Sequence, residues 1–369
     1  MCQLACECKP GMVLYPILKP AIFALDAERA HRLTIQAMKV KPAGNPAAPD
    51  PMLAVRVAGL DFSNPVGLAA GFDKDAEVFG QMLGLGFGFV EVGTLTPRAQ
   101  PGNPKPRLFR LADDEAVINR MGFNNHGQEA AAARLARRKR GGIVGINIGA
   151  NKDSEDRIAD YAAGVRAMAP LADYLTVNIS SPNTPGLRAL QDKGALAELL
   201  ASVIEARGQS GPPRSETAAG PGPAGPPIFL KVAPDLELQD VDDIAGAVMA
   251  QRIDGLIVAN TTISRPPLRS RYAGEAGGLS GAPLKDLALE RLRDFRRATG
   301  GALPLIAAGG IASGADAWAR IKAGASLVQL YSALVYHGPG LARRITRELK
   351  QLATNEGYAR VADAIGAES

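Results

Sequence analysis

Apolar and polar positions along most of this chain form repeating units, each with a short apolar run followed by a longer stretch with helical spacing. Eight such runs are rich in β-branched and aromatic residues and are bounded by glycine, proline or asparagine, which predicts buried strands. The runs are NPVGLAAG (64–71), FVEVGT (89–94), GGIVGINIG (141–149), YLTVNIS (174–180), PIFLKVA (227–233), GLIVAN (255–260), LPLIAAGG (303–310) and SLVQLYSAL (326–334).

Continuously apolar strands that alternate with helices are typical of a parallel sheet buried on both faces. Eight strand–helix units predict an α/β fold of the (β/α)8 TIM-barrel type, and a doubly wound open sheet is the alternative. The chain has 369 residues and a hydrophobic fraction of 46%, which is enough for one large barrel over residues 45–369.

The first 44 residues do not follow this pattern. Residues 1–11 carry all three cysteines without a histidine partner for a metal, so we expect a disordered tail in a reducing compartment and no metal site. Residues 12–40 predict two helices, the second capped by Asp26. Their apolar runs are too short to span a membrane. They are either a helical pair packed on the barrel or an amphipathic element at a membrane surface.

Two proline-rich segments interrupt the apolar pattern. KPAGNPAAPDP (41–51) predicts a linker between the helical element (12–44) and the barrel. The Gly/Pro-rich stretch at about 208–227, before the fifth strand, predicts a disordered loop at the bottom face of the barrel.

Charge adds little to this picture. The net charge is +5, but the basic residues are dispersed and only RLARRKR (134–140) forms a run. We interpret this run as the solvated end of a helix, with contact to anionic lipid head groups as the alternative. Aromatic residues are few and are not interleaved with basic ones, which argues against nucleic-acid binding.

Polar or glycine residues follow all eight predicted strands, and VNISSPNTPG (177–186) is the densest example. Turn chemistry alone could explain one such loop. In a barrel, however, the carboxyl ends of the strands form the rim where active sites are built. The rim positions are Lys74, Thr94, Asn147, Asn178 with Ser181, Lys231, Asn260, Gly309 with Gly310, and Tyr331 with Ser332.

Glycine-rich turns after the seventh and eighth strands predict a phosphate site, although tight turns alone could require these glycines. GLGFGF (84–89) precedes a strand, whereas a dinucleotide-binding fingerprint must follow one, so we discount it.

A set of motifs, in order and at suitable spacing, resembles the family-2, quinone-dependent dihydroorotate dehydrogenases. The set covers the chain from Met12 to its end and is highly specific. The motifs are AAGFDKD, EVGTLTPRAQPGNPKPRLFRL, INRMGFNNHG, GINIGANKD, NISSPNTPGLRALQ, FLKVAPDL, NTT, GGLSG and AAGGIASG.

The resemblance implies oxidation of (S)-dihydroorotate to orotate in pyrimidine biosynthesis, with FMN as hydride acceptor and a membrane quinone of the ubiquinone type as final acceptor. It also implies a monomer held peripherally on the cytoplasmic face of the inner membrane. FMN would contact Ala70, Gly71, Phe72, Asp73, Lys74, Thr94, Asn147, Asn178, Lys231, Ala259, Gly281, Gly310, Tyr331 and Ser332. The substrate would contact Lys74, Asn119, Arg120, Met121, Gly122, Phe123, Asn178, Asn183, Asn260 and Thr261.

Ser181 matches the catalytic base of that family, and the resemblance implies a water chain organised by Thr184 and Phe123. The soluble family-1 relatives carry cysteine at this position, whereas this chain has no cysteine beyond Cys8. His126 is a second candidate base, but we expect it at the surface. Ala259 stands where relatives often have threonine, which puts one FMN contact in doubt.

Elementary chemistry agrees with these assignments. Asparagine amides offer both donors and acceptors to the edges of a pyrimidine, and Lys74 can neutralise its carboxylate. Lys231 lies at a strand end between apolar neighbours, where it can stabilise negative charge on a reduced flavin. Two alternatives remain: a flavin-free barrel lyase or isomerase that binds phosphate, and a non-catalytic flavoprotein or membrane-tethered binding module.

Overall fold

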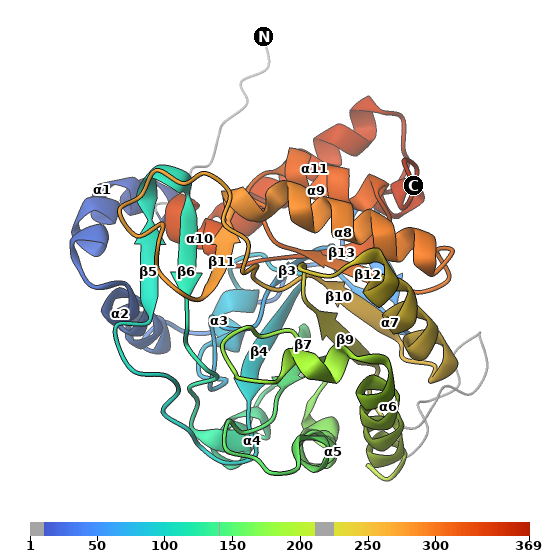
Figure 1. The fold of residues 1–369 in the computed structure, drawn as a ribbon. Helices are drawn as coiled ribbons and strands as arrows, with labels where there is room; N and C mark the ends of the chain where they lie inside the picture. The colour runs from blue at the N-terminus through green and yellow to red at the C-terminus, as the bar shows by residue number, and fades with distance from the viewer. Residues whose placement is uncertain (1–10, 140, 211–224) are drawn as a thin grey trace.

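The computed structural model describes residues 11–139, 141–210 and 225–369, and its centre is a closed barrel of eight parallel strands (Figure 1). Neighbouring barrel strands follow chain order, which confirms the predicted (β/α)8 fold and excludes the open sheet. Each strand overlaps one of the eight predicted apolar runs, with β4 and β13 each extending one residue outside its run. The strands are β3 (Val66–Leu68), β4 (Phe89–Leu95), β7 (Ile143–Ile148), β8 (Tyr174–Asn178), β9 (Ile228–Val232), β10 (Gly255–Val258), β12 (Leu305–Ala308) and β13 (Ala325–Leu330).

The last predicted strand is too long. It was expected over 326–334, but β13 ends at Leu330 and α10 (Ser332–His337) begins two residues later. Tyr331 leaves the extended conformation, with ψ of −63°, and so turns the chain at the barrel rim. The turn places Tyr331 and Ser332 above the barrel instead of in its wall.

Helices surround the barrel and bury the outward faces of the strands in one continuous apolar core (Figure 1). They are α3 (Phe79–Leu83), α4 (Gly127–Leu135), α5 (Arg157–Met168), α6 (Lys193–Gly208), α7 (Leu238–Ala250), α8 (Lys285–Ala298), α9 (Gly314–Lys322) and α11 (Leu341–Asn355). Short 3-10 turns complete the connections: η1 (Ala112–Asp114), η2 (Ala169–Leu171), η3 (Arg188–Gln191), η4 (Ala282–Leu284) and η5 (Val361–Ala364).

Aromatic side chains fill the lower interior of the barrel. Phe89, Tyr174 and Phe229 pack edge to face, with ring centroids 5.3–6.3 Å apart, and Phe62 joins them from the hairpin β1 (Val55–Val57)–β2 (Leu60–Phe62). Glycines on neighbouring strands make room for these rings. A Cβ at Gly145 would lie 2.0 Å from the Tyr174 ring, closer than any packed carbon can come. The hairpin and the rings close the end of the barrel opposite the active-site rim.

A second sheet and a helix pair, neither belonging to the barrel, lie beside the carboxyl ends of the strands (Figure 1). The sheet is antiparallel and was not predicted as strands; it consists of β5 (Leu108–Leu111), β6 (Ala116–Asn119) and β11 (Gly278–Gly281). The helix pair was predicted and is present as α1 (Gly11–Ala24) and α2 (Ala27–Lys39). The Asp26 carboxylate accepts the N–H of Arg29 at 2.9 Å, as expected of the predicted cap.

Arginines of the extra sheet region hold the helix pair in place. Arg107 donates two hydrogen bonds to the buried carboxylate of Glu28, at 2.8 and 3.1 Å. Burial alone would raise the pKa of Glu28, but the hydrogen bonds and charge of Arg107 hold that pKa below its ordinary value. Arg110 donates to main-chain carbonyls at the end of α1, including that of Ile22. No described helix combines the length and apolar character needed to cross a bilayer.

One local prediction is corrected. The basic run 134–140 is not simply solvated, because the Arg138 side chain is 5% exposed and makes a bidentate ion pair with Asp173 that ties the end of α4 to β8. The Gly/Pro-rich loop was predicted from about residue 208, and α6 ends at Gly208, with Arg207 buried against Asp254. The tail at 1–10 and most of that loop, 211–224, lie outside the described residues.

Candidate active site

A cavity of about 610 Å³ opens at the carboxyl ends of the strands and extends beneath the helix pair. Twelve of the fourteen residues predicted to bind FMN line it: Ala70, Gly71, Phe72, Lys74, Thr94, Asn178, Lys231, Ala259, Gly281, Gly310, Tyr331 and Ser332. The predicted base and most predicted substrate residues share this lining: Ser181, Lys74, Asn119, Met121, Gly122, Phe123, Asn178, Asn183, Asn260 and Thr261. The cavity therefore collects candidates from the ends of seven of the eight barrel strands, all except β7.

Three predicted site residues do not line the cavity. Asp73 is buried and accepts the N–H groups of Glu77 and Val78, and burial raises its pKa to about 6 despite these bonds. Arg120 pairs with Glu275 at 2.8 Å. Both side chains shape the loops around the cavity.

The third, Asn147, lies below the cavity in a hydrogen-bonded network around Glu91. Asn147 donates to one oxygen of this fully buried carboxylate at 2.7 Å. The Tyr174 hydroxyl and the Gln329 amide donate to the other oxygen, at 3.0 and 2.8 Å. Asn178 in turn donates to Asn147 at 3.1 Å. The network fixes the amides at the cavity floor.

Lys231 lines the cavity from β9. Its side chain is 5% exposed, and burial lowers its pKa, with the charge of Glu91 opposing the shift. Among the described residues no hydrogen bond to its ammonium is found. An ammonium held in the cavity wall with donors unused is suited to binding an anionic group of a ligand.

Amides and one further lysine surround the polar end of the cavity. Asn183 donates to Asn119 at 3.2 Å, and Asn260 donates to the Ser180 hydroxyl at 2.9 Å. The Lys74 ammonium donates to the Gly71 carbonyl at 2.9 Å, and burial lowers the pKa of Lys74 to about 8. The set presents donors, acceptors and one positive charge to a small polar ring.

Ser181 faces this polar end on the loop after β8. It is 5% exposed, and its hydroxyl accepts the N–H of Asn183 at 3.2 Å. No carboxylate or imidazole within the described ranges bonds to that hydroxyl. Nearby in the same loop, the buried Thr184 hydroxyl has no partner. An unpaired buried hydroxyl marks a place where a bound water would complete the hydrogen bonding.

His126, the alternative base, lies at the surface as expected. It is 72% exposed and pairs with Asp75 at 2.9 Å, and it does not line the cavity.

Glycines open the side of the cavity below the ends of β12 and β13. Gly281 and Gly310 both have positive φ, at 99° and 71°, and a Cβ on Gly310 would lie 2.4 Å from the Lys285 backbone. The Ser280 and Ser332 hydroxyls meet 2.8 Å apart beside them. This glycine-rich corner, the predicted phosphate site, leaves the backbone accessible to an anion.

The opposite end of the cavity is apolar and lies under the helix pair. Leu18, Ile22 and Ala30 line it from α1 and α2, opposite Leu334. His31 lies 3.4 Å from the Tyr331 hydroxyl, and burial, assisted by the charge of Lys74, lowers its pKa to about 3. The imidazole is therefore neutral throughout the physiological pH range.

The fold and this rim define a (β/α)8-barrel enzyme whose rim cavity is polar at one end and apolar at the other. The family model "Dihydroorotate dehydrogenase" matches residues 52–353. The chain belongs to the dihydroorotate dehydrogenase family.

Curated relatives match nearly the whole chain. A protein of Novosphingobium aromaticivorans named dihydroorotate dehydrogenase (quinone) is 61% identical over 363 residues, covering 97% of this chain and all of the relative. One of the same name from Sphingopyxis alaskensis is 62% identical, covering 96% of each chain. The solved structure of Eimeria tenella DHODH in complex with ferulenol has a TM-score of 0.86 at 44% identity, covering 92% of this chain and 95% of that one.

Sequence reasoning missed several residues that organise the site. Glu91, which anchors the cavity floor, lies inside the quoted motif EVGTLTPRAQPGNPKPRLFRL, so it had a positional signal. Arg188, which donates to the Ser180 carbonyl, and Asp235, which pairs with Arg188, lie inside NISSPNTPGLRALQ and FLKVAPDL. Their partners are distant in sequence, however, and no spacing rule connects them. His31 carried no signal, because it lies on a helix outside the barrel pattern.

Proposed function

We propose that this chain oxidises dihydroorotate to orotate and passes the electrons to a quinone, as a step of pyrimidine biosynthesis. The observation that carries the proposal is the single cavity with an amide-lined polar end and an apolar end. A charged substrate dissolved in water and an apolar electron acceptor can enter the same cavity from opposite ends. The names of the relatives agree with this division.

The polar end binds the pyrimidine. Lys74 neutralises the substrate carboxylate, and the amides of Asn119, Asn178, Asn183 and Asn260 satisfy the N–H and C=O edges of the ring. Met121, Gly122, Phe123 and Thr261 complete its surroundings. The hydrogen bonds among these amides and Ser180 orient them before the substrate arrives, which lowers the entropy cost of binding.

Ser181 takes the proton that the substrate ring loses when its carbon–carbon double bond forms. A free serine hydroxyl is a weak base, and no stronger base within the described residues bonds to it. A water bonded to the Thr184 hydroxyl would carry the proton onward, and the unpaired state of that hydroxyl supports this role.

The cavity also fits FMN. The glycine-rich corner suits its phosphate, and the ammonium of Lys231 suits the negative charge of a reduced flavin ring. The chemistry that bound FMN would supply at this place is acceptance of a hydride and release of electrons to a quinone. Thr94 and Asn178 border the same space, while Asn147 supports them from below. Ala259 adds only a methyl group to the wall.

The helix pair, within the element 12–44, forms the quinone end and the membrane contact of a peripheral, monomeric enzyme on the cytoplasmic face of the inner membrane. Several large apolar side chains of this element are exposed: Ile17 is 70% exposed and Val40 87%, and Leu18 and Leu33 are also exposed. Exposed apolar side chains on an amphipathic element are typical of interfacial helices. The apolar cavity lining between the helices supports a path for a lipid-dissolved quinone.

Anaerobic mixing of the purified protein with dihydroorotate tests the function. We expect a yellow protein whose flavin absorbance bleaches on mixing and returns on addition of quinone. A colourless protein would favour a flavin-free lyase or isomerase. A yellow protein that does not bleach would favour a non-catalytic flavoprotein.

A further inference from the structure

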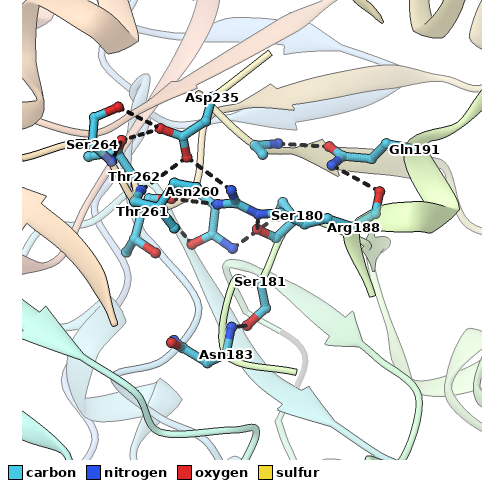
Figure 2. A network of polar contacts seen from close by, with 12 residues as sticks. Ser180, Ser181, Asn183, Arg188, Gln191, Asp235, Asn260, Thr261, Thr262 and Ser264 are labelled. Carbon is cyan, nitrogen blue, oxygen red and sulfur yellow. Dashed lines mark hydrogen bonds and ion pairs between the residues drawn. The ribbon is translucent and has the colours of Figure 1, made fainter. Parts of the chain in front are cut away.

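Arg188 lies in the same β8–α6 connection as Ser181, and its guanidinium contacts three separate segments (Figure 2). Its Nε donates to the carbonyl of Ser180 at 3.1 Å. Its two terminal nitrogens donate to the carbonyl of Thr261 at 3.1 Å and to the carboxylate of Asp235 at 3.0 Å. One rigid planar group thus bridges the loops that follow β8, β9 and β10.

Asp235 extends this bridge to the next part of the chain. Its carboxylate accepts the Thr262 hydroxyl, the Ser264 hydroxyl at 3.2 Å and the N–H of Ile263 at 3.1 Å (Figure 2). The Arg188–Asp235 pair is partly buried, and neither residue lines the cavity. The pair therefore acts on the site through the backbone of other residues.

The two carbonyls held by Arg188 adjoin the residues that meet the substrate in the proposed function. Ser180 directly precedes the base Ser181, and Thr261 directly follows Asn260. The Ser180 hydroxyl also donates to Asn178 at 2.8 Å and accepts from Asn260 at 2.9 Å. The base loop and the pyrimidine-binding loop are therefore joined both by the Arg188 guanidinium and by the direct hydrogen bond from Asn260 to Ser180.

We propose that Arg188 and Asp235 are positioning residues that hold Ser181 at the distance and angle from the bound ring that proton transfer requires. The inference rests on the proposed function. Its physical basis is that a guanidinium can donate in several fixed directions at once, whereas an ammonium provides no planar fork. A small displacement of a proton-transfer group is costly because the reacting atoms must be aligned.

Arg188→Lys and Asp235→Asn test the inference, measured by stopped-flow anaerobic reduction of the bound flavin by dihydroorotate. We expect the limiting rate at saturating substrate to fall by about 10- to 100-fold in Arg188→Lys, the scale of a misaligned general base. Flavin content, the thermal midpoint and reoxidation by quinone should stay close to those of the unchanged protein. Asp235→Asn should show a smaller loss of the same kind.

Chemical rescue separates positioning from folding. In Arg188→Ala, millimolar guanidinium should restore part of the reduction rate, while the same concentration of sodium should not. Arg157→Ala is the matched control, because Arg157 donates to the carbonyl of Pro185 in the same loop at 2.6 Å but from its outer side. This control should keep the full rate.

Each outcome has a definite meaning. Unchanged limiting rates in Arg188→Lys and Asp235→Asn would overturn the inference while leaving the proposed function intact. Parallel loss of flavin, thermal midpoint and rate in Arg188→Ala, without rescue, would assign the pair to folding alone and also overturn it. Failure of the unchanged protein to bleach with dihydroorotate would instead overturn the proposed function.

Discussion

The two ends of the cavity are lined by different kinds of side chain, which come from different parts of the chain. At the polar end, amides and Lys74 project from strand-end loops that hydrogen bond to one another. At the apolar end, α1 and α2 contribute aliphatic side chains and are attached to the barrel by a few arginines. The first end is held by hydrogen bonds between its loops, and the second is a helix pair packed on the barrel, which we propose gives a quinone access from the bilayer. The contrast predicts that substitutions at the polar end slow flavin reduction by dihydroorotate. Changes at the apolar end should instead slow flavin reoxidation by quinone.

Lys231→Ala should have the largest effect, because both half-reactions need the flavin that Lys231 is proposed to hold. The variant loses the ammonium that offsets negative charge in a desolvated site, so we expect it to purify with little or no flavin and to fail in both half-reactions. The ratio of flavin absorbance to protein absorbance measures this. Full flavin content with full activity would contradict the placement of the flavin beside Lys231.

Ser181→Ala should affect only the polar end. We expect flavin reduction by dihydroorotate to slow by about 10²-fold or more, the usual scale for a positioned base. Flavin content and reoxidation by quinone should be unchanged, since the serine contributes little to either. Near-normal reduction in stopped-flow mixing would move the base elsewhere, with His126 next to be tested.

Deletion of residues 1–44 should affect only the apolar end. Bleaching by dihydroorotate should persist, whereas reoxidation by a lipid-dissolved quinone should fall by about tenfold as the protein leaves the bilayer surface. Vesicle sedimentation and quinone kinetics measure the two effects, with flavin content and the thermal midpoint as controls for folding.

A point variant separates membrane contact from the channel. Leu33→Glu changes an exposed side chain that does not line the cavity, so it should weaken sedimentation but leave turnover of a water-soluble quinone intact. If the full-length and truncated proteins are both folded and turn over quinone equally, the helices form no quinone path and serve only to pack against the barrel.

A smaller difference between the two ends is expected in their pH dependence. Lys74, with a pKa of about 8, loses its charge as pH rises through 8, and a bound carboxylate favours the charged form. Orotate affinity should therefore be constant below pH 8 and fall by about tenfold per pH unit above it. His31, with a pKa of about 3, should add no pH dependence to the quinone step between pH 5 and 8. Titration of flavin absorbance with orotate measures the affinity, and Lys74→Arg should flatten the profile.

Much of the fold could be predicted because its signal is periodic. Eight apolar runs correspond to eight barrel strands, and the rim follows from the direction of parallel strands. The antiparallel sheet β5–β6–β11 was missed, since its third strand is more than 150 residues from the other two and the run LFRL is too short to stand out. Tyr331 was placed in a strand, because periodicity does not report where a chain leaves extended geometry.

The sequence by itself determined the barrel, the order of its strands and the collection of polar residues at one rim, because these depend on local hydrophobic patterning and on chain direction. Only the tertiary structure decided which rim residues face the cavity. Asn147 and Asn178 both occur at strand ends, yet the first is held below the floor by Glu91 and the second borders the cavity. Pairs such as Arg188 with Asp235 were likewise decided by the tertiary structure, because their partners meet only after the barrel closes.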